Sequence, residues 1–164
     1  MKRPFSKVVL LLAVVVAGFL GWRLLFPTPE RVIRKRLAAL AQTASSSSKA
    51  SGLARAYNSQ KVAGYFTTDG QIVINISGFQ ATLTGREEML AALMARPQAG
   101  GFTVEFGGIE VTVAPDNNSA VVNLTAKVNM PSERDWNPQE LKLVFQKIDG
   151  AWLISRLETV KTLL

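Results

Sequence analysis

The sequence of 164 residues contains neither cysteine nor histidine. Without cysteine there are no disulfide bonds and no thiol chemistry, and cysteine usage gives no information about the redox compartment. Without histidine the chain lacks the commonest general base near neutral pH and the commonest metal ligand. We therefore expect no metal site and no cofactor.

The folded part of the chain also lacks an excess of charge of either sign. The formal net charge is +7, and residues 1–36 carry all of it, with eight basic residues and one acid, Glu30. Residues 37–164 contain eleven basic and eleven acidic residues. Binding to nucleic acid requires a basic face on the folded domain, so we expect no nucleic-acid partner. The charge favours lipid headgroups or control of topology, although flanking charges usually only position an anchor.

One long apolar run stands near the N-terminus, from Val8 to Phe26, and only Arg23 interrupts it. As a helix these residues would extend roughly 28 Å at about 1.5 Å per residue, close to the hydrocarbon core of a bilayer at about 30 Å. The sequence therefore predicts a short basic tail at residues 1–7 and a transmembrane helix at residues 8–26. Through this anchor, membrane lipids become the first expected partner.

A cleaved signal peptide is the alternative interpretation of this run. Such a peptide ends in small residues, whereas bulky residues such as Phe19 and Trp22 follow Ala17, which favours an uncleaved anchor. Three basic residues precede the run, and five lie between Arg23 and Arg36, which by count favours an external N-terminus. A basic N-terminal tail nevertheless normally stays inside. We expect a single-pass protein of the bacterial inner (cytoplasmic) membrane, with a periplasmic or extracytoplasmic domain.

Residues 28–164 predict one domain with three helices. The first follows Thr28 and Pro29 and repeats apolar residues at helical spacing, namely Ile33, Leu37, Leu40 and Ala44. A second helical stretch covers Ala50–Phe66 and is expected to break into two pieces at Asn58–Ser59 and Gly64. A third covers Arg86–Met94, with Met89, Leu90 and Leu93 on one face.

The remaining segments read as strands. They are Gln71–Ile76, Ala81–Thr84, Phe102–Val113, Ala120–Val128, Leu141–Ile148 and Trp152–Leu163. Gly107–Gly108 predicts a β-bulge, and Asp149–Gly150 predicts a tight hairpin between the last two strands. This order predicts an α+β fold, in which a curved, cone-shaped antiparallel sheet carries the helices on one face.

Three segments carry a resemblance to a known family: Ala63–Gly70, Gly85–Leu90 and Lys147–Ile154. In their order and spacing the chain resembles the nuclear transport factor 2-like domains, also described as SnoaL-like or cystatin-like cone domains. The resemblance implies a conical fold whose sheet and helices enclose an apolar pocket. In relatives this pocket binds a small molecule, performs acid–base chemistry or is filled by core side chains.

Catalytic relatives such as steroid isomerases, polyketide cyclases and small dehydratases place acids, histidines or a tyrosine in the pocket. In an approximate alignment Leu53 stands at the position of the isomerase helix tyrosine. Ile74 or Asn75 replaces the acid of the first strand, and Val144 replaces an acid of a late strand. We therefore predict no catalytic residues, and isomerase or cyclase activity is not expected.

Aromatic side chains are the candidate ligand-binding residues of such a pocket. They are Tyr57, Tyr65, Phe106, Trp136, Phe145 and Trp152. Packing of the core is the default explanation for these aromatic residues. Trp136, which is expected in a loop between strands, either caps the mouth of the pocket or covers an edge of the core. Arg156 and Glu158, two residues apart on the last strand, are either a pocket pair or a surface ion pair. Glu105 and Glu110 are expected to be solvated carboxylates at the sheet edge.

Two functions remain open on these grounds. The first is a non-enzymatic binding or assembly module held at the membrane surface, which binds a protein partner or a second copy of itself through the sheet. The second is a binder of a small molecule or a lipid-derived ligand in the cone pocket.

Overall fold

The computed structural model describes residues 14–16, 27–45, 51–76, 79–95, 101–129 and 138–160. The predicted basic tail at residues 1–7 lies outside these ranges, as does most of the predicted transmembrane segment at residues 8–26. Residues 14–16 of that segment are helical and exposed. No helix in the described ranges is both long and apolar enough to cross a membrane. The anchor therefore stays a prediction from the sequence.

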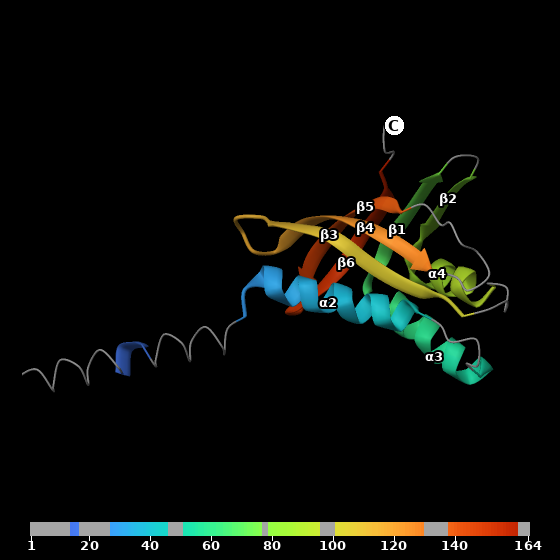
Figure 1. Ribbon diagram of the computed structural model, residues 1–164, viewed down its shortest axis with the longest axis horizontal. Helices are drawn as coiled ribbons and strands as arrows, with labels where there is room; N and C mark the ends of the chain where they lie inside the picture. Colours follow the sequence, from blue (N-terminus) through green and yellow to red (C-terminus); the bar gives the residue numbers. More distant parts are fainter. Residues whose placement is uncertain are drawn as a thin grey trace, which may run out of the picture.

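The domain combines three helices with a six-stranded sheet. The helices are α2 (Pro29–Ala44), α3 (Gly52–Ala63) and α4 (Gly85–Met94), and the strands are β1 (Phe66–Ile76), β2 (Phe79–Thr84), β3 (Thr103–Val113), β4 (Ser119–Asn129), β5 (Gln139–Ile148) and β6 (Ala151–Thr159). Helix α2 runs along the sheet, while α3 and α4 lie together near one end (Figure 1). The predicted α+β class is confirmed.

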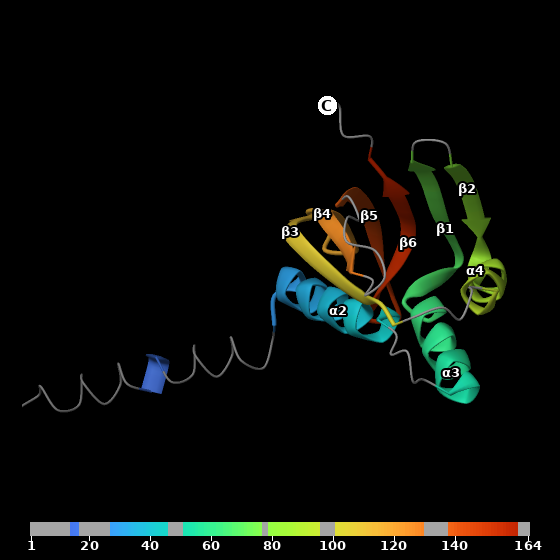
Figure 2. The same cartoon turned by 45° about the vertical axis from the view of Figure 1, so that its right-hand side comes forward.

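The sheet is mixed, which corrects the prediction of an antiparallel sheet. Its strand order is β2-β1-β6-β5-β4-β3 (Figure 2), and β1 runs parallel to β6, whereas every other neighbouring pair is antiparallel. Two antiparallel units, the β1–β2 hairpin and the β3–β6 meander, are joined side by side at β1 and β6. Hairpin signals in the sequence describe only neighbours along the chain, so they do not predict whether β1 and β6 pair in the parallel or the antiparallel sense.

Helix α2 supplies one wall of the core, as its spacing predicted. Ile33, Leu37, Leu40 and Ala41 are buried, while Ala44 is only half-buried. The opposite wall consists of inward-facing residues of the sheet, and the buried cluster as a whole comprises Ile33, Leu37, Leu40, Phe66, Met89, Ala120, Val122, Leu124, Leu143, Phe145, Trp152 and Ile154. Burial of each large apolar side chain stabilises the fold by about 1.5–3 kcal/mol, before the entropy of ordering is subtracted.

Helix α3 differs from the stretch predicted at Ala50–Phe66, which was expected to break into two pieces. It is one continuous helix from Gly52 to Ala63, capped by Ser51, whose Oγ accepts a hydrogen bond from the amide of Ala54 at 3.2 Å. Phe66 belongs to β1 rather than to the helix. The side chain of Leu53 is 83% exposed, and only Ala63 of the helix is buried. The apolar spacing of this helix therefore does not face the core.

The two predicted irregular features of the strands are confirmed. Asp149 and Gly150 both adopt positive φ, at 49° and 80°, which is the backbone that a two-residue hairpin turn with the twist of the sheet requires. The pairing of β3 with β4 shifts register between Gly107 and Glu110, so the glycine pair does form a bulge. Gly108 lies there at a φ of 58°.

Candidate functional site

The six aromatic residues predicted to line a pocket lie in different environments in the structure. Phe145 and Trp152 are 1% and 3% exposed and belong to the core cluster. Tyr65 and Phe106 are half-buried and pack against that cluster. Tyr57 is 58% exposed on α3, so its predicted place in the interior is wrong. Trp136 lies outside the described residues.

Three of these aromatic rings have a cation close to the ring, and for Trp152 it is the Lys147 ammonium, 6.0 Å from the centroid. The guanidinium carbon of Arg36, on α2, lies 5.1 Å from the centroid of the Tyr65 ring. The ammonium of Lys61 lies 5.2 Å from the centroid of Tyr57, one helical turn away on α3. Such contacts stabilise by about 0.5–1 kcal/mol at exposed sites. Tyr65 is therefore held between the core and α2 rather than presented to a cavity.

The interior holds very little polar chemistry. Among the described residues, Thr67 is the single polar residue that is buried, at 1% exposure, and its hydroxyl has no hydrogen-bond partner. No group of three or more acidic side chains in the described ranges could hold a metal ion. Glu105 and Glu110 are both exposed on β3, as expected for solvated carboxylates. The interior is therefore an apolar core in the part that the structure describes.

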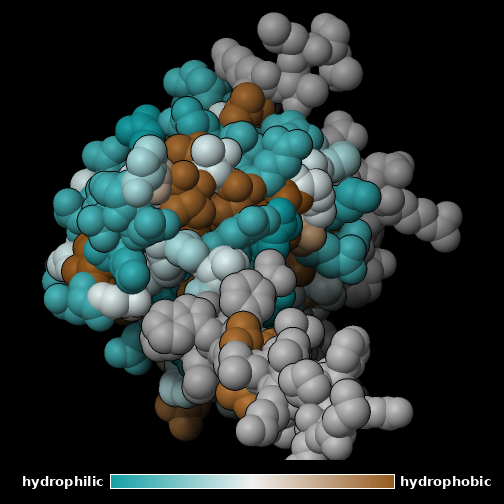
Figure 3. Space-filling view, turned by 90° about the vertical axis from the view of Figure 1, so that its left-hand side faces the viewer, coloured by the Kyte–Doolittle hydropathy of each residue, from teal (hydrophilic) through white to brown (hydrophobic). Residues whose placement is uncertain are grey.

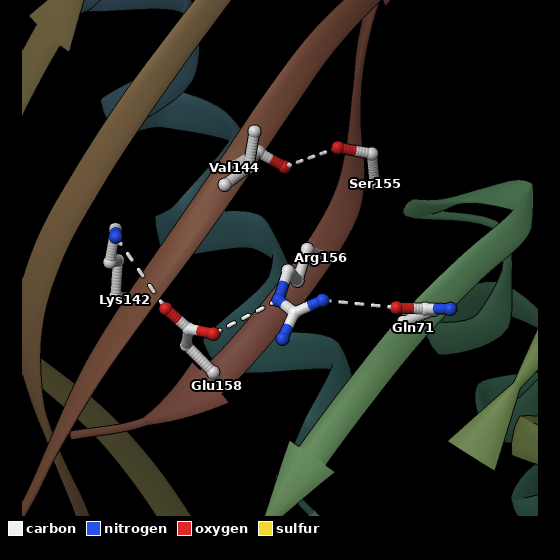
Figure 4. Close-up of polar contacts among 6 residues, drawn as sticks. All are labelled: Gln71, Lys142, Val144, Ser155, Arg156 and Glu158. Carbon is white, nitrogen blue, oxygen red and sulfur yellow. Dashed lines mark hydrogen bonds and ion pairs between the residues drawn. The ribbon is translucent and has the colours of Figure 1, made fainter. Parts of the chain in front are cut away.

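A bulge in β6 decides which side chains point inward. Val144 pairs with Arg156, but Phe145 pairs with Ile154, so Ser155 is an extra residue on β6. The Ser155 hydroxyl donates a hydrogen bond to the Val144 carbonyl at 3.2 Å (Figure 4). Because the extra residue reverses the alternation, Arg156 and Glu158 point away from the core. Strict alternation after Trp152 and Ile154 would have placed both of them inside.

Arg156 and Glu158 consequently form a surface ion pair on the side of the sheet opposite α2, and not a pocket pair. Arg156 Nε donates to Glu158 Oε2 at 2.9 Å, and Arg156 Nη1 donates to the Gln71 side-chain oxygen at 3.1 Å. Lys142 Nζ lies 3.5 Å from Glu158 Oε1. The network thus crosses β5, β6 and β1, and α2 passes behind these strands (Figure 4).

No helix of the described ranges covers this side of the sheet (Figure 1), which we call the open sheet face and define by three groups of residues. Its ion network is Gln71, Lys142, Arg156 and Glu158, and its half-buried apolar centre is Val73, Val121 and Val144. Thr125 and Glu140 extend it, because the Thr125 hydroxyl donates to the Glu140 carboxylate at 3.0 Å. Figure 3 views the molecule from the left-hand side of Figure 1, where hydrophobic residues lie at the surface among hydrophilic ones. An apolar centre with a polar rim is the usual composition of a protein–protein interface.

The network lowers the pKa of the Glu158 carboxyl below its ordinary value of 4.5. The hydrogen bond from Arg156 is the largest cause, and the charges of Arg156 and Lys142 act in the same direction, whereas burial opposes them. A carboxyl with a lowered pKa in the folded state adds stability above its unfolded pKa, and this contribution disappears as the pH falls through the folded value.

We therefore expect Glu158→Gln to destabilise the domain most at pH values above about 4.5, and progressively less as the pH falls through the lowered pKa of Glu158. The loss near neutral pH should be about 0.2–1 kcal/mol, since partly exposed ion pairs contribute little. Urea unfolding of the full chain in detergent, at neutral pH and at about pH 3, measures it. An equal difference between the two chains at both pH values would contradict the role of the charge.

Sequence reasoning missed three residues that organise these surfaces. Gln71 and Lys142 join the network only because β1 and β5 flank β6 in space. Arg86, at the start of α4, donates from Nε and Nη2 to the Phe66 carbonyl and ties α4 to β1. No pattern among neighbouring residues in the sequence predicts such contacts. The position of Val144, opposite Arg156 on the open sheet face, also shows that it does not line the interior as the approximate alignment implied.

Solved structures share this fold at low sequence identity. A nuclear transport factor 2-like protein with a cystatin-like fold from Novosphingobium aromaticivorans is 19% identical, covers 85% of this chain and 86% of its own, and has a TM-score of 0.65. A similar protein of unknown function from Shewanella oneidensis is 16% identical, covers 82% and 100%, and has a TM-score of 0.62. A cystatin-like protein from Nostoc punctiforme is 14% identical, covers 79% and 88%, and has a TM-score of 0.59.

No protein of curated function matches the sequence. The model of the SnoaL-like domain, in contrast, matches residues 51–158. This match spans most of the chain and includes every strand, α3 and α4. Together with the strand order and the cystatin-like structures, it shows that the chain belongs to the SnoaL-like domain family.

Proposed function

We propose that the chain is a single-pass membrane protein whose SnoaL-like domain acts as a non-enzymatic binding or assembly module at the membrane surface. The packed interior supports this proposal most strongly. Phe145 and Trp152, two of the residues that would line a ligand pocket, are almost completely buried among aliphatic side chains. A small-molecule site needs an open cavity with converging polar groups. Here, the polar and charged side chains lie on the outside of the sheet.

The open sheet face is the surface that this module would use. No helix of the described residues covers it. Its valines provide apolar area, and the fixed ion network restricts the orientation in which a partner can bind. Ion pairs held in place before binding lose less side-chain entropy on association. Both signs of charge are present, so a second copy or a protein partner with a mixed surface fits this face better than nucleic acid.

Membrane attachment is tested by alkaline carbonate extraction of membranes that contain the full chain. We expect the chain to stay in the membrane pellet, because a run of 19 apolar residues interrupted by one charge inserts stably. The matched control replaces Leu12 and Val15 by Arg, which makes insertion unfavourable by about 2.5–3.5 kcal/mol per charge. Release of the unaltered chain by carbonate would refute the anchor.

A ligand-binding function is a second candidate, and the buried Thr67 hydroxyl favours it. A hydroxyl without a partner at 1% exposure is costly to bury, and it is the kind of polar group that orients a ligand in an apolar pocket. The candidate predicts that a small molecule or a lipid-derived ligand co-purifies with the full chain and is lost in Thr67→Val. Native mass spectrometry of both chains, released from the same detergent, distinguishes the two functions.

A further inference from the structure

Helix α2 has an outward face that the core does not use. Its buried face is formed by Ile33, Leu37, Leu40 and Ala41. The exposed positions fall on the opposite side of the helix and are Glu30, Arg31, Arg34, Lys35, Ala38 and Gln42. All the cations of this exposed face therefore lie in the N-terminal half of the helix.

Two of these three cations form no ion pair within the described part of the domain. Arg34 pairs with Glu30, with 2.9 Å between Nη2 and Oε1. Arg31 and Lys35 form no ion pair with any acid of the described residues. Their long side chains are thus available to a partner outside the domain.

The position of Arg31 also opposes the stability of the helix. The N-terminus of a helix carries a partial positive charge, so a cation in the first turn is unfavourable and cations in the last turn are favourable. In α2, Arg31 lies in the first turn, Arg34 and Lys35 lie in the second, and the last turn contains no basic residue. For Arg31 and Lys35, neither packing nor ion pairing within the described residues therefore gives a reason for this arrangement.

The length of chain before α2 supplies a reason. Phe26 ends the apolar run and Pro29 begins α2, so only Pro27 and Thr28 lie between them, and the extended chain from Phe26 to Pro29 spans at most about 10 Å. Arg31 lies about 3 Å further along the helix axis and Lys35 about 9 Å. Headgroups extend roughly 5–7 Å beyond the hydrocarbon core, and charges act over about 8 Å at physiological salt. With the run in a membrane, Arg31 lies within reach of the headgroups for any tilt of α2, and Lys35 lies within reach when α2 is inclined towards the membrane surface.

We propose that Arg31, Arg34 and Lys35 bind anionic lipid headgroups and so fix the orientation of the domain on the membrane. This inference rests on the proposed membrane attachment. Anionic phosphates attract each cation near the surface and compensate for the unfavourable place of Arg31 at the helix N-terminus. The domain beyond α2 has no net charge that would compete for this surface.

The absence of cysteine makes the test direct, because one introduced cysteine is the only labelling site. The full chain carrying Ala38→Cys, with a fluorophore on the exposed face of α2, is reconstituted into vesicles of phosphatidylcholine alone or with one quarter phosphatidylglycerol. Acrylamide, a neutral aqueous quencher, then reports how far water reaches the label. We expect quenching at least about twofold weaker in the anionic vesicles, and this difference should disappear at high salt.

Charge-matched variants identify the residues responsible. Arg31→Gln, Arg34→Gln and Lys35→Gln together should abolish the difference between the two vesicle types. Removal of three exposed cations elsewhere, by K61Q, K127Q and K147Q, should leave it intact. Equal quenching in both vesicle types, or equal loss in both triple variants, would overturn the inference. Carbonate extraction of the same chains separates this failure from a failure of membrane attachment.

Discussion

Insertion of one alanine between Ser155 and Arg156 is expected to prevent the domain from folding. Ser155 is already the extra residue of the β6 bulge, and one further residue would reverse the alternation of every side chain that follows it. Either Arg156 and Glu158 would then enter the core, or Trp152 and Ile154 would leave it. A one-residue slip moves every side chain of a strand to the other face. A buried charge without its partners costs several kcal/mol, comparable to the total stability of a domain of this size.

The matched control for the insertion is Ser155→Ala. Alanine keeps the extra residue and removes only the hydrogen bond from the Ser155 hydroxyl to the Val144 carbonyl at 3.2 Å. Its expected cost is about 0.5–1.5 kcal/mol. Circular dichroism and urea unfolding of the full chains in detergent measure both variants. A cooperative transition near that of the unaltered chain in the insertion variant would show that the spacing at the bulge does not set the two faces of β6.

Phe145→Ala is expected to destabilise the domain by about 3–5 kcal/mol, and Trp152→Ala by a similar amount. Both side chains are almost completely buried in the core cluster, so truncation leaves a cavity that the surrounding strands cannot fill by relaxation. Tyr57→Ala, in contrast, should cost less than about 1 kcal/mol. The Tyr57 ring is 58% exposed and contacts the Lys61 ammonium, so only a weak exposed interaction is lost.

The shift in the midpoint of urea unfolding distinguishes core residues from pocket-lining residues. Aromatic residues that line an open cavity leave less of a void when truncated, and their loss would mainly affect a bound ligand. A small loss of stability for Phe145→Ala, together with displacement of a co-purified ligand, would therefore support a ligand-binding interior over the packed one.

Local features of the fold were accessible from the sequence. The β5–β6 hairpin was predictable because Asp149 and Gly150 tolerate the positive φ of the turn. Helix α2 was predictable because Ile33, Leu37 and Leu40 repeat at helical spacing directly after a proline. In both cases the decisive residues are neighbours along the chain, and their chemistry alone selects the backbone.

Features that depend on distant residues were not accessible. The parallel pairing of β1 with β6 joins residues at opposite ends of the domain, and no turn signal marks it. Ser155 is an ordinary strand residue, so the bulge that turns Arg156 outward leaves no trace in the pattern. Leu53 and Tyr57 have the spacing of a buried helix face, but spacing does not say whether any element covers that face. The candidate site was therefore assigned to the interior although the charged network lies outside.

Photo-crosslinking in native membranes tests most directly whether the domain works through its open sheet face. A benzophenone side chain is introduced at Val144, in the apolar centre of that face, or at Tyr57, on the exposed side of α3. We predict one discrete adduct from position 144 and none from position 57. An adduct of twice the mass of the chain would identify a second copy, and another single mass would identify a protein partner. The absence of an adduct at position 144, or the same adducts from both positions, would contradict the account.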